Sequence, residues 1–135
     1  MRLWHQDLIP LLPRQQLLGQ HRECCALRGK GWGKKHATVN YIFNHSYFDL
    51  YCYHYVVMRE MSKRGYNVDV KWLSPTYRGK ILGYDFSVIP EASKFKSVVK
   101  DGVLIYTEHD DNYKTECLNN LQNKNVKILD KLIKI

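Results

Sequence analysis

A single carboxylate lies within a strongly basic stretch, and this stretch is the part of the sequence best suited to chemistry. Glu23 stands in the segment GQHRECCALRGKGWGKK, residues 19–35. The same segment carries five cations, which are Arg22, Arg28, Lys30, Lys34 and Lys35. Basic side chains in this density are typical of phosphate binding. Glu23 is then either a residue that acts on what the cations hold or a salt-bridged residue of an exposed helix, and both interpretations stay open at this point.

The chemistry available to one carboxylate on a nucleic acid is limited. When a base leaves its sugar, positive charge develops at C1′, and a nearby carboxylate stabilises that charge. If the attacking group is an amine, a Schiff base forms and the carboxylate can move protons during strand cleavage. The best amine near neutral pH is the N-terminus, because its ordinary pKa is about 7.7–8.0 against about 10.4 for lysine.

The charge balance points to a polyanionic partner, either nucleic acid or an anionic membrane surface. The 135 residues carry a net charge of +8, and residues 1–44 hold seven Arg and Lys against two acids. The length suits one domain, residues 1–135. There is no targeting segment and no apolar run that could span a bilayer, so we expect a cytoplasmic protein without a membrane partner. Four cysteines, which are Cys24, Cys25, Cys52 and Cys117, are then expected to be reduced and mostly buried.

Metal chemistry finds little support in the spacing of the possible ligands. The candidates are His21, Cys24, Cys25, His36, Cys52 and His54. Adjacent cysteines point about 100° apart on a helix, and no CxxC pair recurs. The dense acids of a metal-dependent nuclease are found only at Glu108, Asp110 and Asp111, where a helix N-terminus favours negative charge anyway. We therefore predict no metal and no cofactor.

The elements that must position these residues are mainly helices, which predicts an all-α fold with three main helices and long loops. The expected helices cover residues 13–28, 47–64 and 108–123. Ser46 is the expected cap of the second helix, whose inner face should comprise Leu50, Tyr53 or His54, Val57 and Met61. The stretch SVVKDGVLIY, with Asp-Gly between apolar runs, suggests a hairpin. The basic amphipathic tail, residues 125–135, is either a membrane-contacting segment or a final docking helix, and we favour the docking helix.

Several ordered segments together resemble the pyrimidine dimer DNA glycosylase family. LPRQQLLGQHREC is similar to the first helix of that family, which carries a glutamine, an apolar pair and then Arg-Glu. KKHATVNYIF, MREMSKRGYNVD and YRGK follow in the family's order, so the resemblance covers roughly residues 1–80. The family's aromatic and basic C-terminal segment has no match in VKILDKLIKI.

The resemblance implies a compact all-α DNA repair enzyme that removes a damaged pyrimidine from double-stranded DNA and nicks the strand by β-elimination. Glu23 matches the carboxylate that stabilises the imine, Arg22 the phosphate-binding arginine and Gln15 the glutamine on the same face. The nucleophile is the α-amine of Met1, since the large Arg2 is expected to prevent removal of the initiator methionine. DNA-binding residues are then expected at Arg2, Gln15, Arg22, Arg28, Lys30, Trp32, Lys34 and Lys35, in a protein that acts as a monomer.

A non-enzymatic nucleic-acid-binding protein is the alternative. It would use the same basic residues, with Trp32 and tyrosines stacking on bases. Such a protein would keep its binding when Glu23 is changed and would never form a covalent adduct with DNA.

Overall fold

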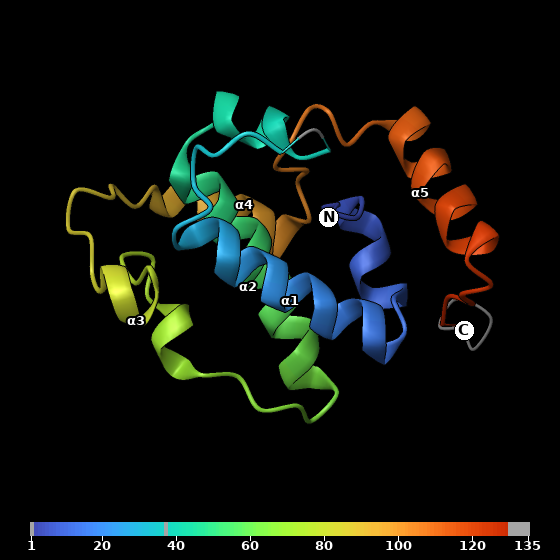
Figure 1. Cartoon of the computed structure of the whole chain (residues 1–135), viewed down its shortest axis with the longest axis horizontal. Coiled ribbons are helices and arrows are strands. Elements are labelled where there is room, and N and C mark those ends of the chain that lie inside the picture. The colour runs from blue at the N-terminus through green and yellow to red at the C-terminus, as the bar shows by residue number, and fades with distance from the viewer. Residues whose placement is uncertain (1, 37, 130–135) are drawn as a thin grey trace.

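Helices make up all the regular structure that the computed structural model describes, which covers residues 2–36 and 38–129 (Figure 1). The α-helices are α1 (Arg14–Arg28), α2 (Tyr47–Lys63), α3 (Gly79–Leu82), α4 (Ala92–Asp101) and α5 (Asp111–Asn123). Three 3-10 helices join them, η1 (Gln6–Leu11), η2 (Asn40–Asn44) and η3 (Val70–Leu73). Within these residues there is no β-strand, so the predicted all-α fold is confirmed.

The two longest helices begin and end close to where the sequence predicts. Pro13 precedes α1, and Gly29 follows it, with its amide bonded to the Cys25 carbonyl oxygen. The Ser46 side chain accepts a hydrogen bond from the Asp49 amide and so caps α2. Local signals are sufficient here because each boundary is set by a residue that either cannot continue a helix or can satisfy its free amides.

The core forms where α1 packs on α2. Leu17 and Cys24 of α1 are fully buried in this core, as are Leu50 and Val57 of α2. The predicted inner face of α2 is confirmed, and Tyr53 and His54 both belong to it because α2 is covered on more than one side. None of the described helices is long and apolar enough to cross a membrane. All four cysteines are free thiols, and Cys25 is the half-buried one.

The predicted hairpin is wrong, because residues 92–101 form the helix α4. Its apolar side chains recur at helical spacing, and Phe95 and Val98 pack against the core that α2 borders. The Asp-Gly pair ends this helix instead of turning a hairpin. Gly102 adopts the left-handed conformation, with φ of 70°, that suits the position after a helix.

The last helix and the tail also differ from the prediction. α5 begins at Asp111, not at residue 108, because the Asp110 side chain accepts from the Tyr113 amide and caps the helix there. Residues 126–129 of the expected docking helix are not helical, and the Leu129 amide donates to the Leu11 carbonyl. Residues 130–135 of that expected helix lie outside the described part of the chain.

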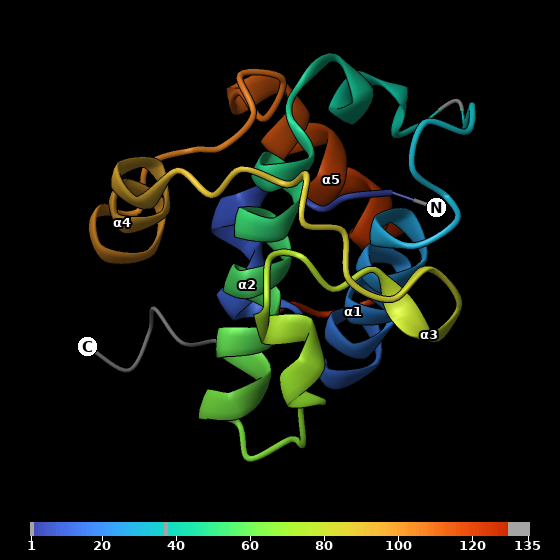
Figure 2. The same cartoon turned by 90° about the vertical axis from the view of Figure 1, so that its left-hand side faces the viewer.

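The N-terminal segment, residues 2–5, lies between α1 and α5, as the two views agree (Figures 1 and 2). Leu3 is fully buried and Trp4 nearly so. This short extended segment is therefore an internal part of the fold, which brings the start of the chain to the middle of α1.

Candidate active site

Glu23 faces the N-terminal segment from the middle of α1. Its half-buried carboxylate accepts a hydrogen bond from the backbone amide of Arg2, with 3.3 Å between that nitrogen and Oε2. The same Oε2 accepts from Gln20 Nε2 at 3.2 Å. The carboxylate is thus fixed by two donors beside the first peptide bond of the chain. Met1, the predicted nucleophile, lies outside the described residues.

Gln20 is the residue that joins Glu23 to the start of the chain. Its amide nitrogen also donates to the Arg2 carbonyl at 3.0 Å, and its Oε1 accepts from the Trp4 amide at 2.7 Å and lies 2.8 Å from the Tyr53 hydroxyl oxygen. The side chain is almost completely buried. The sequence places Gln20 one turn before Glu23, and this spacing is the signal that finds it, because residues three apart on a helix are neighbours.

Gln15 does not occupy the place that the sequence suggested. It was expected on the same face as Glu23, but it is exposed two turns earlier, where it lines a shallow hollow of about 340 Å³ with Arg14, Leu18 and Arg22. The glutamine that contacts the carboxylate is Gln20. Arg22 is exposed as expected, and its guanidinium has no hydrogen bond or ion pair with any residue that the structure describes.

Arg28 was expected to bind DNA, but its side chain is fully buried. It donates to five acceptors, which are the backbone oxygens of Trp72, Ser74 and Tyr77, the Tyr47 hydroxyl and His54 Nδ1. A buried guanidinium is stable only when its donors are satisfied. Arg28 therefore holds residues 72–77, which comprise the end of η3 and the turn after it, against the end of α1.

Arg2 is likewise turned toward the protein. Its guanidinium lies over the rings of Trp4 and Tyr113, 5.8 and 5.7 Å from their centroids, and 3.9 Å from a carboxylate oxygen of Glu116. These contacts anchor the segment that carries residue 1.

The turn after α1 presents the remaining predicted cations. Lys30, Lys34 and Lys35 are exposed in it. Gly31 lets the turn close tightly, because a Cβ there would lie 2.8 Å from the Ala26 carbonyl oxygen. Trp32 is half-buried in the same turn, so its indole is held in place within an otherwise exposed basic loop.

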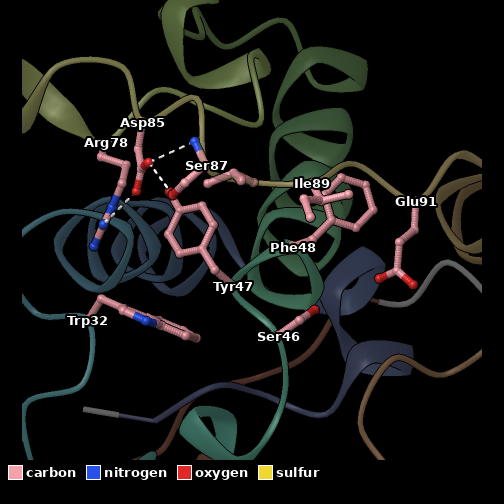
Figure 3. A pocket seen from close by; sticks show the side chains of 10 residues that line it. Trp32, Ser46, Tyr47, Phe48, Arg78, Asp85, Ser87, Ile89 and Glu91 are labelled. Atoms are coloured by element: carbon pink, nitrogen blue, oxygen red, sulfur yellow. Dashed lines mark hydrogen bonds and ion pairs between the residues drawn. The ribbon is translucent and has the colours of Figure 1, made fainter.

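Trp32 and Tyr47 border an opening of about 540 Å³ (Figure 3). Their rings meet edge to face, 5.3 Å apart, and the Arg78 guanidinium lies 5.0 Å from the centre of the Tyr47 ring. Arg78 is held by Asp85, whose carboxylate also accepts from Ser87. In the sequence, Arg78 stands out only as part of the YRGK segment. Glu23 does not line this opening, so the aromatic opening and the carboxylate are separate features.

Three of the six candidate metal ligands do come together. His21 Nδ1 lies 2.8 Å from His54 Nε2, and the Cys25 sulfur lies 3.8–4.0 Å from the two rings. Arg28, which can only donate, faces Nδ1 of His54 at 2.9 Å. The proton of neutral His54 is therefore on Nε2, which donates to His21. This tautomer disfavours a metal, because a ligating histidine normally donates, and does not accept, at its other nitrogen.

Burial sets the protonation of this cluster. It lowers the pKa of His54 well below 6.5, with the Arg28 charge acting in the same direction, and it raises the pKa of Cys25 to about 11. The cluster thus consists of neutral groups. Cys24, Cys52 and His36 take no part in it, because Cys24 and Cys52 are buried elsewhere and His36 is exposed.

The acids proposed for a metal-dependent nuclease do not form a group that could hold an ion in the described part of the chain. Glu108 pairs with His45 at 2.9 Å, and Asp110 caps α5. Asp111 lies in the first turn of that helix, where it complements the helix dipole.

Comparison with known proteins finds a family match for the first half of the chain. A family model described as "Pyrimidine dimer DNA glycosylase" matches residues 1–74, which is more than half of the 135 residues. Searches of curated proteins and of solved structures give no match. The matched range contains the N-terminal segment, α1 with Glu23, the basic turn and α2.

Proposed function

This chain belongs to the pyrimidine dimer DNA glycosylase family, and we propose that it excises cyclobutane pyrimidine dimers and then nicks the DNA strand as an AP lyase, acting as a monomer on damaged double-stranded DNA. The proposed nucleophile is the α-amine of Met1, and the proposed electrostatic partner is the Glu23 carboxylate. No metal or cofactor is required for this reaction.

The observation that carries the proposal is the hydrogen bond from the Arg2 amide to Glu23. Covalent geometry keeps the α-amine of residue 1 within about 4 Å of that amide nitrogen, whatever the conformation of residue 1. This hydrogen bond therefore supports an amine and a carboxylate in the same neighbourhood. This is the pair of groups that imine formation at a deoxyribose requires.

The steps follow from ordinary acid–base chemistry. The unprotonated amine attacks C1′ while the bond from C1′ to the base breaks, and the base leaves with that electron pair. The nitrogen then passes a proton to the ring oxygen O4′ as the bond from C1′ to O4′ breaks, which opens the sugar and leaves a protonated Schiff base at C1′. Glu23 stabilises the positive charge at C1′ and accepts the proton from C2′, and the 3′ phosphate is eliminated.

The DNA contacts are proposed for the exposed part of the basic segment. Arg22 would hold the phosphate next to the reacting sugar, and Gln15 lies on the same exposed side of α1. Lys30, Lys34 and Lys35 would neutralise further phosphates, and Trp32 would contact a base or sugar. Arg28 is left out because it is buried, and Arg2 is proposed to act through its backbone.

Borohydride trapping tests the proposal. The protein is mixed with DNA that contains one abasic site or one cyclobutane dimer, and borohydride reduces any imine to a stable amine. We expect a covalent adduct whose peptide maps to Met1. Selective acetylation of the α-amine should abolish it, whereas lysines contribute little because roughly one in 10³ is unprotonated at pH 7 with an ordinary pKa.

Two results would contradict the proposal. One is strand nicking that proceeds normally without any trapped adduct, and the other is an adduct that maps to a lysine and survives acetylation of the α-amine. A chelator should change neither trapping nor nicking, which separates imine chemistry from a metal-dependent nuclease.

A further inference from the structure

We infer that Tyr113 of α5 is a positioning residue that holds the N-terminal segment, residues 2–5, in place for the imine-forming reaction, an inference that rests on the proposed function. The juxtaposition is between α5, which lies beyond the matched residues 1–74, and the first residues of the chain. The Tyr113 hydroxyl donates to the Leu3 carbonyl at 2.6 Å.

Three consecutive backbone carbonyls of the N-terminal segment each accept a hydrogen bond from a different helix. Gln20 of α1 donates to the Arg2 carbonyl at 3.0 Å, and Tyr53 of α2 donates to the Trp4 carbonyl at 2.6 Å. Tyr113 supplies the middle contact. An extended segment lacks hydrogen bonds of its own, so these three side chains replace the pairing that a helix or sheet would provide.

Tyr113 is itself fixed before it reaches Leu3. Its backbone amide donates to the Asp110 cap at 2.8 Å, and its ring stacks on His109 with 5.0 Å between centroids. The Arg2 guanidinium also lies over the Tyr113 ring, 5.7 Å from its centre. Burial also raises the pKa of the Tyr113 phenol, so the hydroxyl keeps the proton that it donates.

The position of this contact along the chain gives it a catalytic consequence. Leu3 is two residues from the reacting amine, so a shift of its carbonyl is transmitted through only a few bonds. A displacement of about 1 Å from the geometry of attack can cost a factor of up to about 10² in rate. Tyr113 touches no substrate in this scheme, and it acts through the backbone of residues 2 and 3.

The experiment compares two tyrosine-to-phenylalanine variants of the full chain. Tyr113→Phe removes only the hydroxyl that holds Leu3. Tyr51→Phe is the matched control, because the Tyr51 hydroxyl also donates to a backbone carbonyl at 2.6 Å, that of Leu73, away from the N-terminal segment. Both variants lose one partly buried hydrogen bond to a backbone carbonyl, so a general loss of stability should affect them alike.

Two measurements read out positioning. In single-turnover borohydride trapping on abasic DNA, Tyr113→Phe should be slowed about tenfold or more with its DNA dissociation constant within about twofold of wild type. Hydrogen exchange of the Trp4 amide, which is bonded to Gln20, should become at least several-fold faster. Tyr51→Phe should match wild type in both. Tyr53→Phe, which releases the next carbonyl, should behave like Tyr113→Phe.

The possible failures are distinguishable. If wild-type protein traps normally and Tyr113→Phe traps at the same rate, the inference is wrong while the proposed function stands. An equal slowing of Tyr51→Phe would also overturn the inference, since it would show a general effect of destabilisation. If the wild-type protein never traps, the proposed function itself fails, and the role of Tyr113 fails with it.

Discussion

Two stretches of α1 carry the same kinds of residue and use them differently. In the middle of the helix, Arg22 is exposed and Glu23 faces the start of the chain. At the end of the helix, Arg28 is fully buried among backbone carbonyls. The difference teaches that the role of an arginine in a basic segment depends on the hydrogen-bond acceptors around it. Where irregular backbone needs donors, the guanidinium becomes part of the fold.

The largest expected effect is a loss of stability when the buried arginine, Arg28, is removed. Arg28→Ala removes a fully buried guanidinium that donates to three backbone carbonyls and the Tyr47 hydroxyl. We expect a loss of about 3 kcal/mol or more in the free energy of unfolding, measured by urea denaturation. Arg22→Ala is the matched control on the same helix and should stay within about 0.5 kcal/mol of wild type. Equal losses in the two variants would contradict the assignment of Arg28 to the fold.

The second prediction concerns the pH dependence of stability at the Arg28 end. The unfolded chain protonates His54 near its ordinary pKa of 6.5, whereas the folded protein keeps it neutral because burial and Arg28 lower that pKa. The unfolded state therefore binds more protons, and stability falls as the pH drops below 6.5, by up to about 1.4 kcal/mol per pH unit.

Urea denaturation at several pH values measures this slope. His54→Asn retains an acceptor for Arg28 but no titrating group, so its slope between pH 6.5 and 5 should be flatter. His36→Asn, at an exposed position, should leave the slope unchanged. A wild-type slope that His54→Asn does not alter would remove His54 from the buried neutral cluster.

The smallest expected effect concerns DNA binding by the exposed arginine, Arg22. Arg22→Ala should weaken binding to duplex DNA and reduce the steepness of its salt dependence by about one phosphate contact. Fluorescence anisotropy at several salt concentrations measures this. Lys100 of α4, on the far side of the molecule from α1 in Figure 2, provides the control, and Lys100→Ala should leave the salt dependence unchanged. If both variants gave the wild-type salt dependence, Arg22 would not contact the DNA.

The sequence predicts the limits of the helices better than it predicts which elements pack together. The limits of α1 and α2 follow from Pro13, Gly29 and Ser46, because caps and breakers act locally. The pair Asp101 and Gly102 is ambiguous, since the same dipeptide ends a helix or turns a hairpin. Only the packing of α4 on α2 decides between them.

The candidate site shows the same division. Glu23 and Arg22 stand out because a lone acid and its neighbouring cation are visible in the sequence. The sequence does not single out Gln20, and it predicts Arg28 as a DNA-binding residue, because burial depends on contacts with residues 2–4 and 72–77. Tyr113 could not be found from the sequence, since 110 positions separate it from Leu3.

The most direct test of the account is Glu23→Gln. This change keeps the shape of the side chain and removes its charge, so the hydrogen bond from the Arg2 amide can be kept. We predict that the variant binds damaged duplex DNA at least as well as wild type, while strand nicking falls by a factor of about 10²–10³ because the charge that stabilises C1′ is lost. Nicking at the wild-type rate would contradict the central claim and would return Glu23 to the role of a helix surface residue.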